Sequence, residues 1–267
     1  MSNESEYVLG TDAAELERLG FQHRLWSAQA FALWEQAGLA TGQRVLDVGA
    51  GPGYASEDLA RIVGPRGSVL AVDASQRFLD ALARRQPAGV TTRCMDVQAL
   101  DLPAAAFDFA YARWVLCFVP DPEAVVRGVA RALAPGGRFA IQDYYRYLAL
   151  ALAPPSATLA RVVDAVAASW RAHGGDPEIG LRLPLLLERH GLRVERVAPL
   201  VRCTRPGQAL WEWPGTFFRT FTPKLVETGY LTRAEHEAFH REWDERTRRG
   251  DSVFVSPPML DIVAVKA

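Results

Sequence analysis

The stretch VLDVGAGPG, residues 45–53, decides the fold of this 267-residue chain. Its first half, with Arg44, is a short and nearly continuous apolar run, which is typical of a parallel strand buried on both faces. The glycines that follow allow a tight turn and let a ligand approach the main chain closely. A helical pattern then continues to about Ile62. A strand, a glycine turn and a helix in this order predict a nucleotide-type site at the carboxyl end of the strand.

Two positions separate this stretch from a dinucleotide-binding site. The glycine spacing is GxGxG, and Tyr54 stands where the third glycine of a GxGxxG fingerprint would fall. Asp47 stands where a dinucleotide-binding fold would carry another apolar strand residue. A dehydrogenase of that kind and a purely structural turn are the two rival interpretations, and both residues disfavour the first.

Strands and helices alternate beyond this stretch. Four further strands are predicted from apolar runs at 68–73, 90–95, 107–112 and 138–143. A helical pattern fills 75–85, and Asp121 followed by Pro122 is a typical N-cap and first-turn proline of another helix, which Pro135-Gly136-Gly137 would end. This alternation predicts an α/β fold over about residues 41–146, with βαβ units, a mostly parallel sheet and helices on both faces.

The rest of the chain departs from this rhythm. Helices are predicted at 12–38, where Gly20 could break or bend the run, and at 157–173 and 181–190, and strands at 192–203 and 258–267. Between these two strands lies an aromatic-rich, charged segment, 204–257, whose helical pattern runs from about 232 to 246. This segment is either a βαβ crossover or an insertion between two antiparallel edge strands, and the residue pattern favours neither.

Acidic residues end three of the predicted strands. Asp47, Asp73 and Asp96 come to the same edge if the strands are parallel neighbours. A carboxylate at Asp73 can accept hydrogen bonds from the two hydroxyls of a ribose. Asp96 could accept from an exocyclic amine such as that of adenine, and the main-chain N–H of Val97 could donate to a ring nitrogen. With no lysine or arginine in the glycine loop to suggest phosphate, these residues predict a pocket for adenine, ribose and an amine.

The segments VLDVGAGPG, VLAVD, CMDVQAL, FDFAYARWVLCFVPDP and LAPGGRFAIQDY resemble, in order and spacing, the motifs of class I S-adenosylmethionine-dependent methyltransferases. The resemblance covers about residues 41–146. It implies a Rossmann-like, seven-stranded, mostly parallel sheet with an antiparallel last strand. It therefore pairs 192–203 with 258–266 and makes 204–257 an insertion. It also implies an enzyme of the small-molecule type, with S-adenosyl-L-methionine as cofactor.

The resemblance also divides the chain. Residues 1–40 would be an N-terminal helical cap and 41–146 the cofactor-binding Rossmann-like core. Residues 147–191 would be a helical cap insertion and a core helix, 192–203 and 258–267 edge strands of the core, and 204–257 a lid insertion.

The resemblance implies roles for particular residues. The loop from Gly49 to Gly53 would hold the methionine part of the cofactor with Asp47 close by, and Ala112-Arg113-Trp114 would lie beside the transferable methyl. Tyr7 and Gln22 lie in an N-terminal segment that folds over the cofactor in related enzymes. The expected cofactor-binding residues are Gln22, Asp47, Gly49, Ala50, Gly51, Asp73, Ala74, Asp96, Val97 and Arg113.

The acceptor site is expected above the sulfonium methyl. Aromatic residues at Trp211, Trp213, Phe217, Phe218 and Phe221 suit a plain core or an apolar substrate wall equally well. The expected substrate residues are Trp114, Tyr144, Tyr145, Trp213 and Phe218. The acceptor would be a small molecule of specialised metabolism, methylated at O, N or C. No catalytic base is identified; His23 and His173 are candidates, with helix-surface or capping roles as the alternative.

Composition limits the other functions. The formal net charge is -1, so no basic field points to nucleic acid. The (D/N/S)-P-P-(Y/F) motif of amino-methylating DNA enzymes does not follow the fourth strand. An RNA or protein methyltransferase, or a binding protein of the same fold with non-methylating activity, remains the alternative.

No apolar stretch reaches the ~20 residues of a membrane span, and the polar N-terminus is unlike a signal peptide. A soluble cytoplasmic protein is expected, and its oligomeric state is not predicted.

Two further motifs are given structural interpretations. The three cysteines have neither disulfide nor zinc spacing. His236 and His240 form a literal HExxH, a pattern of zinc hydrolases. Charged residues surround this motif and no third ligand follows it, so a solvated helix is preferred and no metal is expected. The run Arg246-Arg248-Arg249 is interpreted as a solvated turn.

Overall fold

A seven-stranded sheet in the order β3-β2-β1-β4-β5-β10-β7 is the centre of the computed structural model, which describes residues 13–267. Its strands are β1 (Arg44–Val48), β2 (Ser68–Asp73), β3 (Val90–Cys94), β4 (Phe107–Arg113), β5 (Leu133–Tyr144), β7 (Leu192–Leu200) and β10 (Met259–Lys266). The first five pair in parallel, and β10 runs antiparallel to both of its neighbours, β5 and β7. The expected α/β fold with an antiparallel last strand is confirmed.

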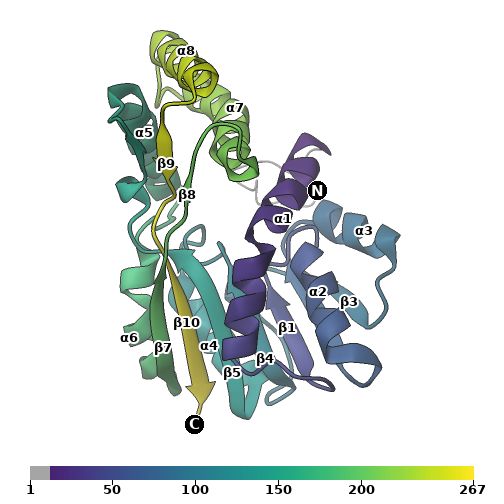
Figure 1. Ribbon diagram of the computed structural model, residues 1–267. Helices are drawn as coiled ribbons and strands as arrows, with labels where there is room; N and C mark the ends of the chain where they lie inside the picture. Colours follow the sequence, from purple (N-terminus) through teal and green to yellow (C-terminus); the bar gives the residue numbers. More distant parts are fainter. Residues whose placement is uncertain (1–12) are drawn as a thin grey trace.

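Helices cover both faces of this sheet (Figure 1). Those closest to it are the second half of α1 (Ala13–Gln36), α2 (Tyr54–Val63), α3 (Gln76–Arg85), α4 (Pro122–Ala132) and α6 (Leu183–Arg189). Successive strand residues alternate between the two faces. Val45 therefore belongs to a cluster with Trp34 of α1 and Leu59 of α2, whereas Leu46 belongs to the larger cluster that includes Val125 of α4. The buried sheet fixes the strand ends that carry the candidate site.

A smaller layer lies beyond the carboxyl ends of the parallel strands (Figure 1). It consists of α5 (Ala157–Ala172), α7 (Glu212–Glu227), α8 (Arg233–Arg249) and a three-stranded antiparallel sheet, in the order β6 (Ala151–Ala153), β9 (Val253–Val255), β8 (Cys203–Thr204). We call this layer the cap. Because β7 and β10 pair directly and antiparallel, the segment between them is an insertion and not a crossover. None of the described helices is both long and apolar enough to cross a membrane.

Two parts of the cap were not predicted. Helix α7 contains Gly215 and, in its interior, Pro223, which disfavour a helix. Its buried aromatic face packs against the rest of the cap and outweighs that preference. The predicted strand 192–203 is also too long. It ends at Leu200 as β7, and the chain then enters the second sheet as β8. A two-residue strand is too short to give a periodic signal.

One smaller prediction was also wrong. Pro135-Gly136-Gly137 lies within β5, which begins directly after α4 ends at Ala132. Gly20 does not break α1, which is continuous from Ala13 to Gln36. Its missing side chain lets Tyr54 approach, because a Cβ at this position would lie 2.9 Å from the Tyr54 hydroxyl.

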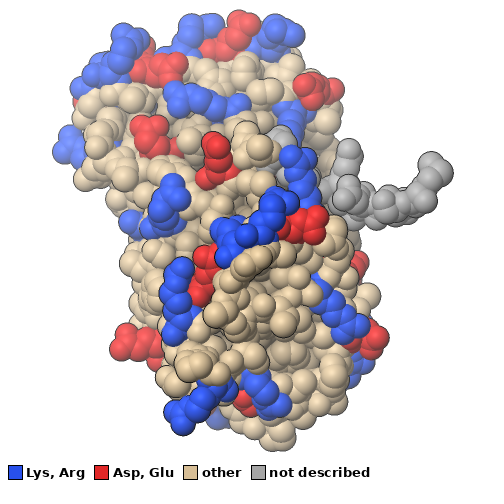
Figure 2. Space-filling model, turned by 90° about the vertical axis from the view of Figure 1, so that its right-hand side faces the viewer, with Lys and Arg blue, Asp and Glu red and all other residues tan. Residues whose placement is uncertain are grey.

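Charged side chains of both signs are interspersed on the face shown in Figure 2, over the cap and over the core. Charged side chains of the described residues also form ion pairs, such as Arg85 with Glu57 and Arg219 with Asp244. This face has no continuous basic area of the kind that would follow a phosphate backbone.

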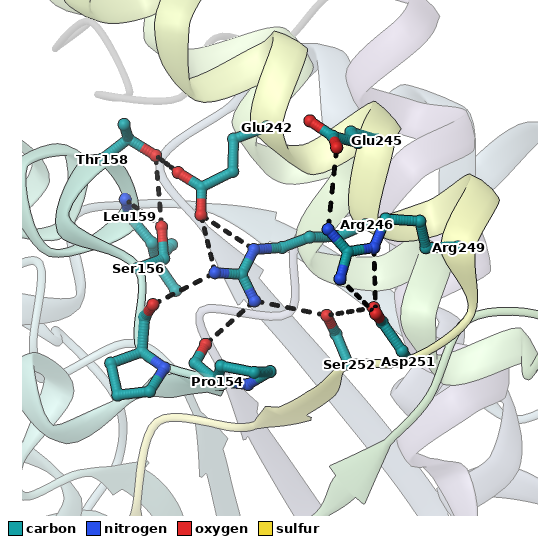
Figure 3. Close-up of polar contacts among 11 residues, drawn as sticks. Pro154, Ser156, Thr158, Leu159, Glu242, Glu245, Arg246, Arg249, Asp251 and Ser252 are labelled. Atoms are coloured by element: carbon teal, nitrogen blue, oxygen red, sulfur yellow. Dashed lines mark hydrogen bonds and ion pairs between the residues drawn. The ribbon is translucent and has the colours of Figure 1, made fainter.

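The interpretation of Arg246-Arg248-Arg249 as a solvated turn was wrong, because these residues form the last turn of α8. The Arg246 side chain is only 14% exposed. Its Nε donates to Glu242 Oε1 at 2.8 Å, and its two Nη groups donate to the carbonyl oxygens of Pro154 and Pro155 at 2.9 and 3.1 Å (Figure 3). Glu242 also accepts from Thr158 Oγ1 at 2.5 Å. Arg246 thus joins α8 to the segment between β6 and α5.

Candidate functional site

The glycine loop lies at the carboxyl end of β1. Gly49 and Gly51 both have positive φ, 66° and 56°, which favours glycine. A Cβ at Gly49 would lie 2.6 Å from Val115, whereas a Cβ at Gly51 would meet nothing within 4 Å. The Ala50 N–H donates to Val72 O at 2.9 Å and fixes the loop against β2. The loop is therefore packed on one side and open above Gly51, which suits close approach of a ligand to the main chain.

Asp73, at the end of β2, holds this loop in place. Its Oδ2 accepts from the Gly51 N–H at 2.8 Å, and its Oδ1 accepts from the Ser75 N–H at 2.8 Å. Burial raises the pKa of Asp73, and these two hydrogen bonds oppose the rise. Each carboxylate oxygen keeps acceptor capacity for a hydroxyl group. Ala74, the next residue, accepts a hydrogen bond from the Cys94 thiol at 3.4 Å.

Asp47 is 2% exposed and lies below the loop. Its Oδ2 accepts from the Ser56 hydroxyl of α2 at 2.6 Å. Burial raises the pKa of Asp47 to about 6, while the hydrogen bond from Ser56 and the positive charge of Arg113 oppose the rise. The partner that a buried carboxylate requires is thus present.

His23 joins α1 to the end of β4 through a chain of polar contacts. Arg113 Nη2 lies 2.9 Å from His23 Nδ1, and His23 Nε2 lies 2.8 Å from Asp58 Oδ2. A guanidinium only donates, so Nδ1 accepts from Arg113 and Nε2–H donates to Asp58. Both ring nitrogens are occupied, and His23 is not placed as a free base. Arg113 Nη1 is buried without a hydrogen-bond partner in the described part of the chain.

Three other predicted residues are described by their local contacts. Asp96 is exposed and accepts from the Gln98 N–H at 2.9 Å, and Val97 beside it is buried. The Met95 N–H, just before them, donates to Asp73 O at 3.0 Å. His173 is exposed at the end of α5, where its Nδ1 lies 2.7 Å from Ser169 O, which is a capping arrangement. Tyr7 lies outside the described residues.

An aromatic cavity lies between α1, the core and the cap. Its lining residues are Arg18, Leu19, Gln22, Trp114, Phe118, Tyr144, Tyr147, Leu150, Trp170, Trp213, Pro214, Phe217, Phe218, Phe254 and Pro257. Trp114 stacks on Trp213, with ring centroids 6.2 Å apart, and on Tyr144, also at 6.2 Å. Trp213 Nε1 donates to Gln22 Oε1 at 2.8 Å. Gln22 therefore fixes an aromatic wall of this cavity.

The structure places some of the predicted substrate residues in this cavity and others outside it. Of the expected substrate residues, Trp114, Tyr144, Trp213 and Phe218 line it, whereas Tyr145 packs beside Gly180 and does not. Tyr147 and Trp170 also line it and were not predicted. Of the aromatic residues of the insertion, Phe217 joins the wall, while Trp211 and Phe221 are buried in the cap.

Trp114 connects the cavity to the glycine loop. Arg113, which precedes it, contacts its ring face, with the guanidinium carbon 5.0 Å from the ring centroid. The φ angle of Trp114 is 52°, which is rare for a bulky residue and must be imposed by the surroundings. The Trp114 N–H donates to Gln142 O at 2.9 Å. This backbone conformation holds a cavity-lining ring directly after the strand end that borders the loop.

The HExxH histidines have a structural role. His236 Nδ1 and His240 Nε2 lie 2.8 and 2.9 Å from the Thr222 hydroxyl and so connect α8 to α7. Within residues 13–267, no group of three or more His, Cys, Asp or Glu side chains is placed to hold a metal ion.

Comparisons with known proteins agree with this geometry. A family described as a methyltransferase domain matches residues 46–141. The 2-phytyl-1,4-naphtoquinone methyltransferase of Synechococcus elongatus is 39% identical over 129 residues, 46% of this chain and 54% of that protein. Methyltransferase str2 of Strobilurus tenacellus is 30% identical over 190 residues, 70% of this chain and 66% of that protein. The chain spans about half the length of several curated relatives that it matches.

Solved structures share the fold. The YcgJ protein of Bacillus subtilis superposes with a TM-score of 0.59 at 17% identity, covering 89% of this chain and 97% of that chain. The [4+2]-cyclase SpnF superposes with a TM-score of 0.55 at 18% identity, covering 90% of this chain and 80% of that chain. At these identities the similarity concerns the fold alone.

Proposed function

We propose that this chain, which carries a class I S-adenosylmethionine-dependent methyltransferase domain, transfers a methyl group from that cofactor to a small-molecule acceptor in the aromatic cavity. The observation that carries the proposal is the position of Trp114. This residue lines the cavity and directly follows Arg113 at the strand end beside the glycine loop. A ligand over the loop and a ligand in the cavity would therefore be neighbours.

The residues around the loop fit the cofactor. Open space above Gly51 leaves room for the methionine part, and the Asp73 carboxylate has capacity for two ribose hydroxyls. We assign Arg113 to the methionine end, oriented by His23 and Asp58. Asp96 and Val97 remain proposed adenine contacts. S-adenosylmethionine supplies an electrophilic methyl group. The chain therefore has to bind the cofactor and the acceptor, orient them toward each other and exclude water.

The acceptor site follows from the cap. We assign the 204–257 insertion as a lid, because its Trp213, Phe217 and Phe218 close the cavity against α1 and Trp114. A closed apolar wall excludes water and holds an acceptor in one orientation. A compact apolar compound, such as an intermediate of specialised metabolism, suits this wall better than a nucleic acid or a protein chain.

Cofactor binding is the first test. In calorimetry, S-adenosylmethionine and S-adenosylhomocysteine should bind with micromolar dissociation constants, without added metal. NAD is the control ligand, because Tyr54 and Asp47 depart from a dinucleotide site. Heat from NAD and none from the other two ligands would contradict the proposal. Binding of S-adenosylmethionine without methyl transfer to any acceptor would favour a non-methylating activity on the same fold.

Trp213→Ala should weaken acceptor use and spare the cofactor. Its ring contacts Trp26 and Trp114, at centroid distances of 5.0 and 6.2 Å, and forms a wall of the cavity. We expect the acceptor KM to rise about tenfold, equivalent to about 1.4 kcal/mol, and the cofactor Kd to change less than twofold. Steady-state kinetics measures the acceptor KM, and calorimetry measures the cofactor Kd. Trp213→Phe keeps a ring in the wall, so its acceptor KM should lie between those of the original chain and Trp213→Ala. Loss of cofactor binding in a folded Trp213→Ala protein would refute the lid assignment.

A further inference from the structure

The aromatic cavity contains a cluster of unpaired hydrogen-bond donors. Tyr144, Tyr147 and Trp170 pack together, with ring centroids 5.1 Å apart for the two tyrosines and 4.5 Å apart for Tyr147 and Trp170. Their exposed fractions are 6%, 3% and 2%. Trp170 Nε1 is buried without a hydrogen-bond partner, and neither tyrosine hydroxyl is hydrogen-bonded to another described residue. Donors that lose water without gaining a protein acceptor are unfavourable, so this cluster would gain from an acceptor atom in the cavity.

The charges around this donor cluster are unbalanced. Among the described residues that line the cavity, none is Asp or Glu. Arg18 lies in the lining and is paired with Glu15 at 2.7 Å, and Gln22 Oε1 already accepts from Arg18 and from Trp213. Burial raises the pKa of both Tyr144 and Tyr147, so their hydroxyls stay protonated at neutral pH. The cluster therefore offers donors and no negative charge.

An ammonium group would be unfavourable here, because it would lose its hydration without meeting a carboxylate among the described residues that line the cavity. A ligand oxygen would instead satisfy donors that are otherwise unpaired. The chemistry of the lining thus separates oxygen-bearing acceptors from amines, although aromatic walls alone would suit either.

We propose that the acceptor is a hydroxylated aromatic compound, and not an amine, whose oxygen accepts hydrogen bonds from Tyr144 and Tyr147. This inference rests on the proposed function, because it concerns the acceptor of the same site. The hydroxyl oxygen then lies at a fixed place in the cavity, and one donor cluster selects the substrate class.

The experiment uses the full chain saturated with S-adenosylhomocysteine and three probes of similar size: 4-methylphenol, toluene and 4-methylbenzylamine. Calorimetry should show 4-methylphenol binding at least about tenfold more tightly than toluene, and the amine more weakly than either. In the double variant Tyr144→Phe/Tyr147→Phe, affinity for 4-methylphenol should fall about tenfold, since two donors are lost. Affinity for toluene should stay within about twofold, because the rings remain. Tyr145→Phe, a neighbouring tyrosine outside the cavity, should change neither value.

Three results would overturn the inference. They are equal affinity of the double variant and the original chain for 4-methylphenol, tighter binding of the amine than of the phenol, and no binding of 4-methylphenol at millimolar concentration. S-adenosylhomocysteine is titrated first. If that titration shows no binding, the proposed function fails. If S-adenosylhomocysteine binds and the probes are not discriminated as expected, only the assignment of the acceptor fails.

Discussion

Arg246→Met is expected to lower the free energy of unfolding by about 3 kcal/mol, at the lower end of the range for removing one partner of a buried ion pair. The Glu242 side chain is 27% exposed, so water would partly compensate its lost partner. The carbonyl oxygens of Pro154 and Pro155 would lose their donors as well. The methionine keeps much of the side-chain volume, so the effect should reflect the polar contacts shown in Figure 3.

Chemical denaturation measures this loss, and the same helix provides a control. Arg241 is 72% exposed, and its ion pair with Glu237 is 3.8 Å long. Arg241→Met should therefore leave the unfolding transition nearly unchanged, as is usual for exposed pairs. Arg246→Lys keeps the charge but loses the planar guanidinium that reaches two carbonyls. Its free energy of unfolding should therefore lie between those of the original chain and Arg246→Met. An Arg246→Met protein as stable as the Arg241→Met protein would show that the contacts of Arg246 contribute little to stability.

The core could be predicted from the sequence because each of its elements has a local signal. Buried parallel strands appear as apolar runs, and Asp121 and Pro122 mark the beginning of α4 at the expected position. The antiparallel pair β7 and β10 is different. Its residues alone left a crossover open, and only the resemblance to a known family favoured the pairing that the structure has.

The cap was harder to predict because long-range packing determines it. Helix α7 forms in spite of Pro223, since Phe218 and Leu225 are buried against other elements. The strands of the second sheet are two or three residues long and lie far apart in the sequence. The two carbonyl groups that Arg246 contacts, those of Pro154 and Pro155, are likewise about ninety residues away, so a run of arginines looks like an exposed turn.

In the candidate site, too, some residues have a local sequence signal and others depend on long-range packing. The loop and Asp73 belong to one motif and could be located in advance. Tyr144 and Tyr145 could not both face the cavity, because successive residues of an extended chain point to opposite sides. Tyr147 and Trp170 look like ordinary buried aromatics, and their unpaired donors become evident only when the cavity is seen.

Asp73→Ala is expected to weaken binding of S-adenosylhomocysteine by about 1.5–3 kcal/mol, the range for hydrogen bonds to a charged group. Two effects combine in this loss. The carboxylate would no longer be available to a ribose, and the Gly51 N–H would lose the acceptor that holds the loop. The fold should survive, because burial raises the pKa of Asp73 and its removal relieves the cost of burying a charge.

A comparison of ligands separates these two effects. Calorimetry with S-adenosylhomocysteine and with its 2′,3′-dideoxy analogue should show a large difference for the original chain, because only the first ligand has hydroxyls for the carboxylate. The difference should nearly vanish in Asp73→Ala, since a double-mutant cycle isolates the direct contact. Asp80→Ala, which removes an exposed acid of α3 whose carboxylate accepts a hydrogen bond from Gln76, is the control and should bind both ligands like the original chain. If Asp73→Ala still distinguishes the two ligands, the carboxylate does not bind the ribose, and Asp73 acts only by holding the loop.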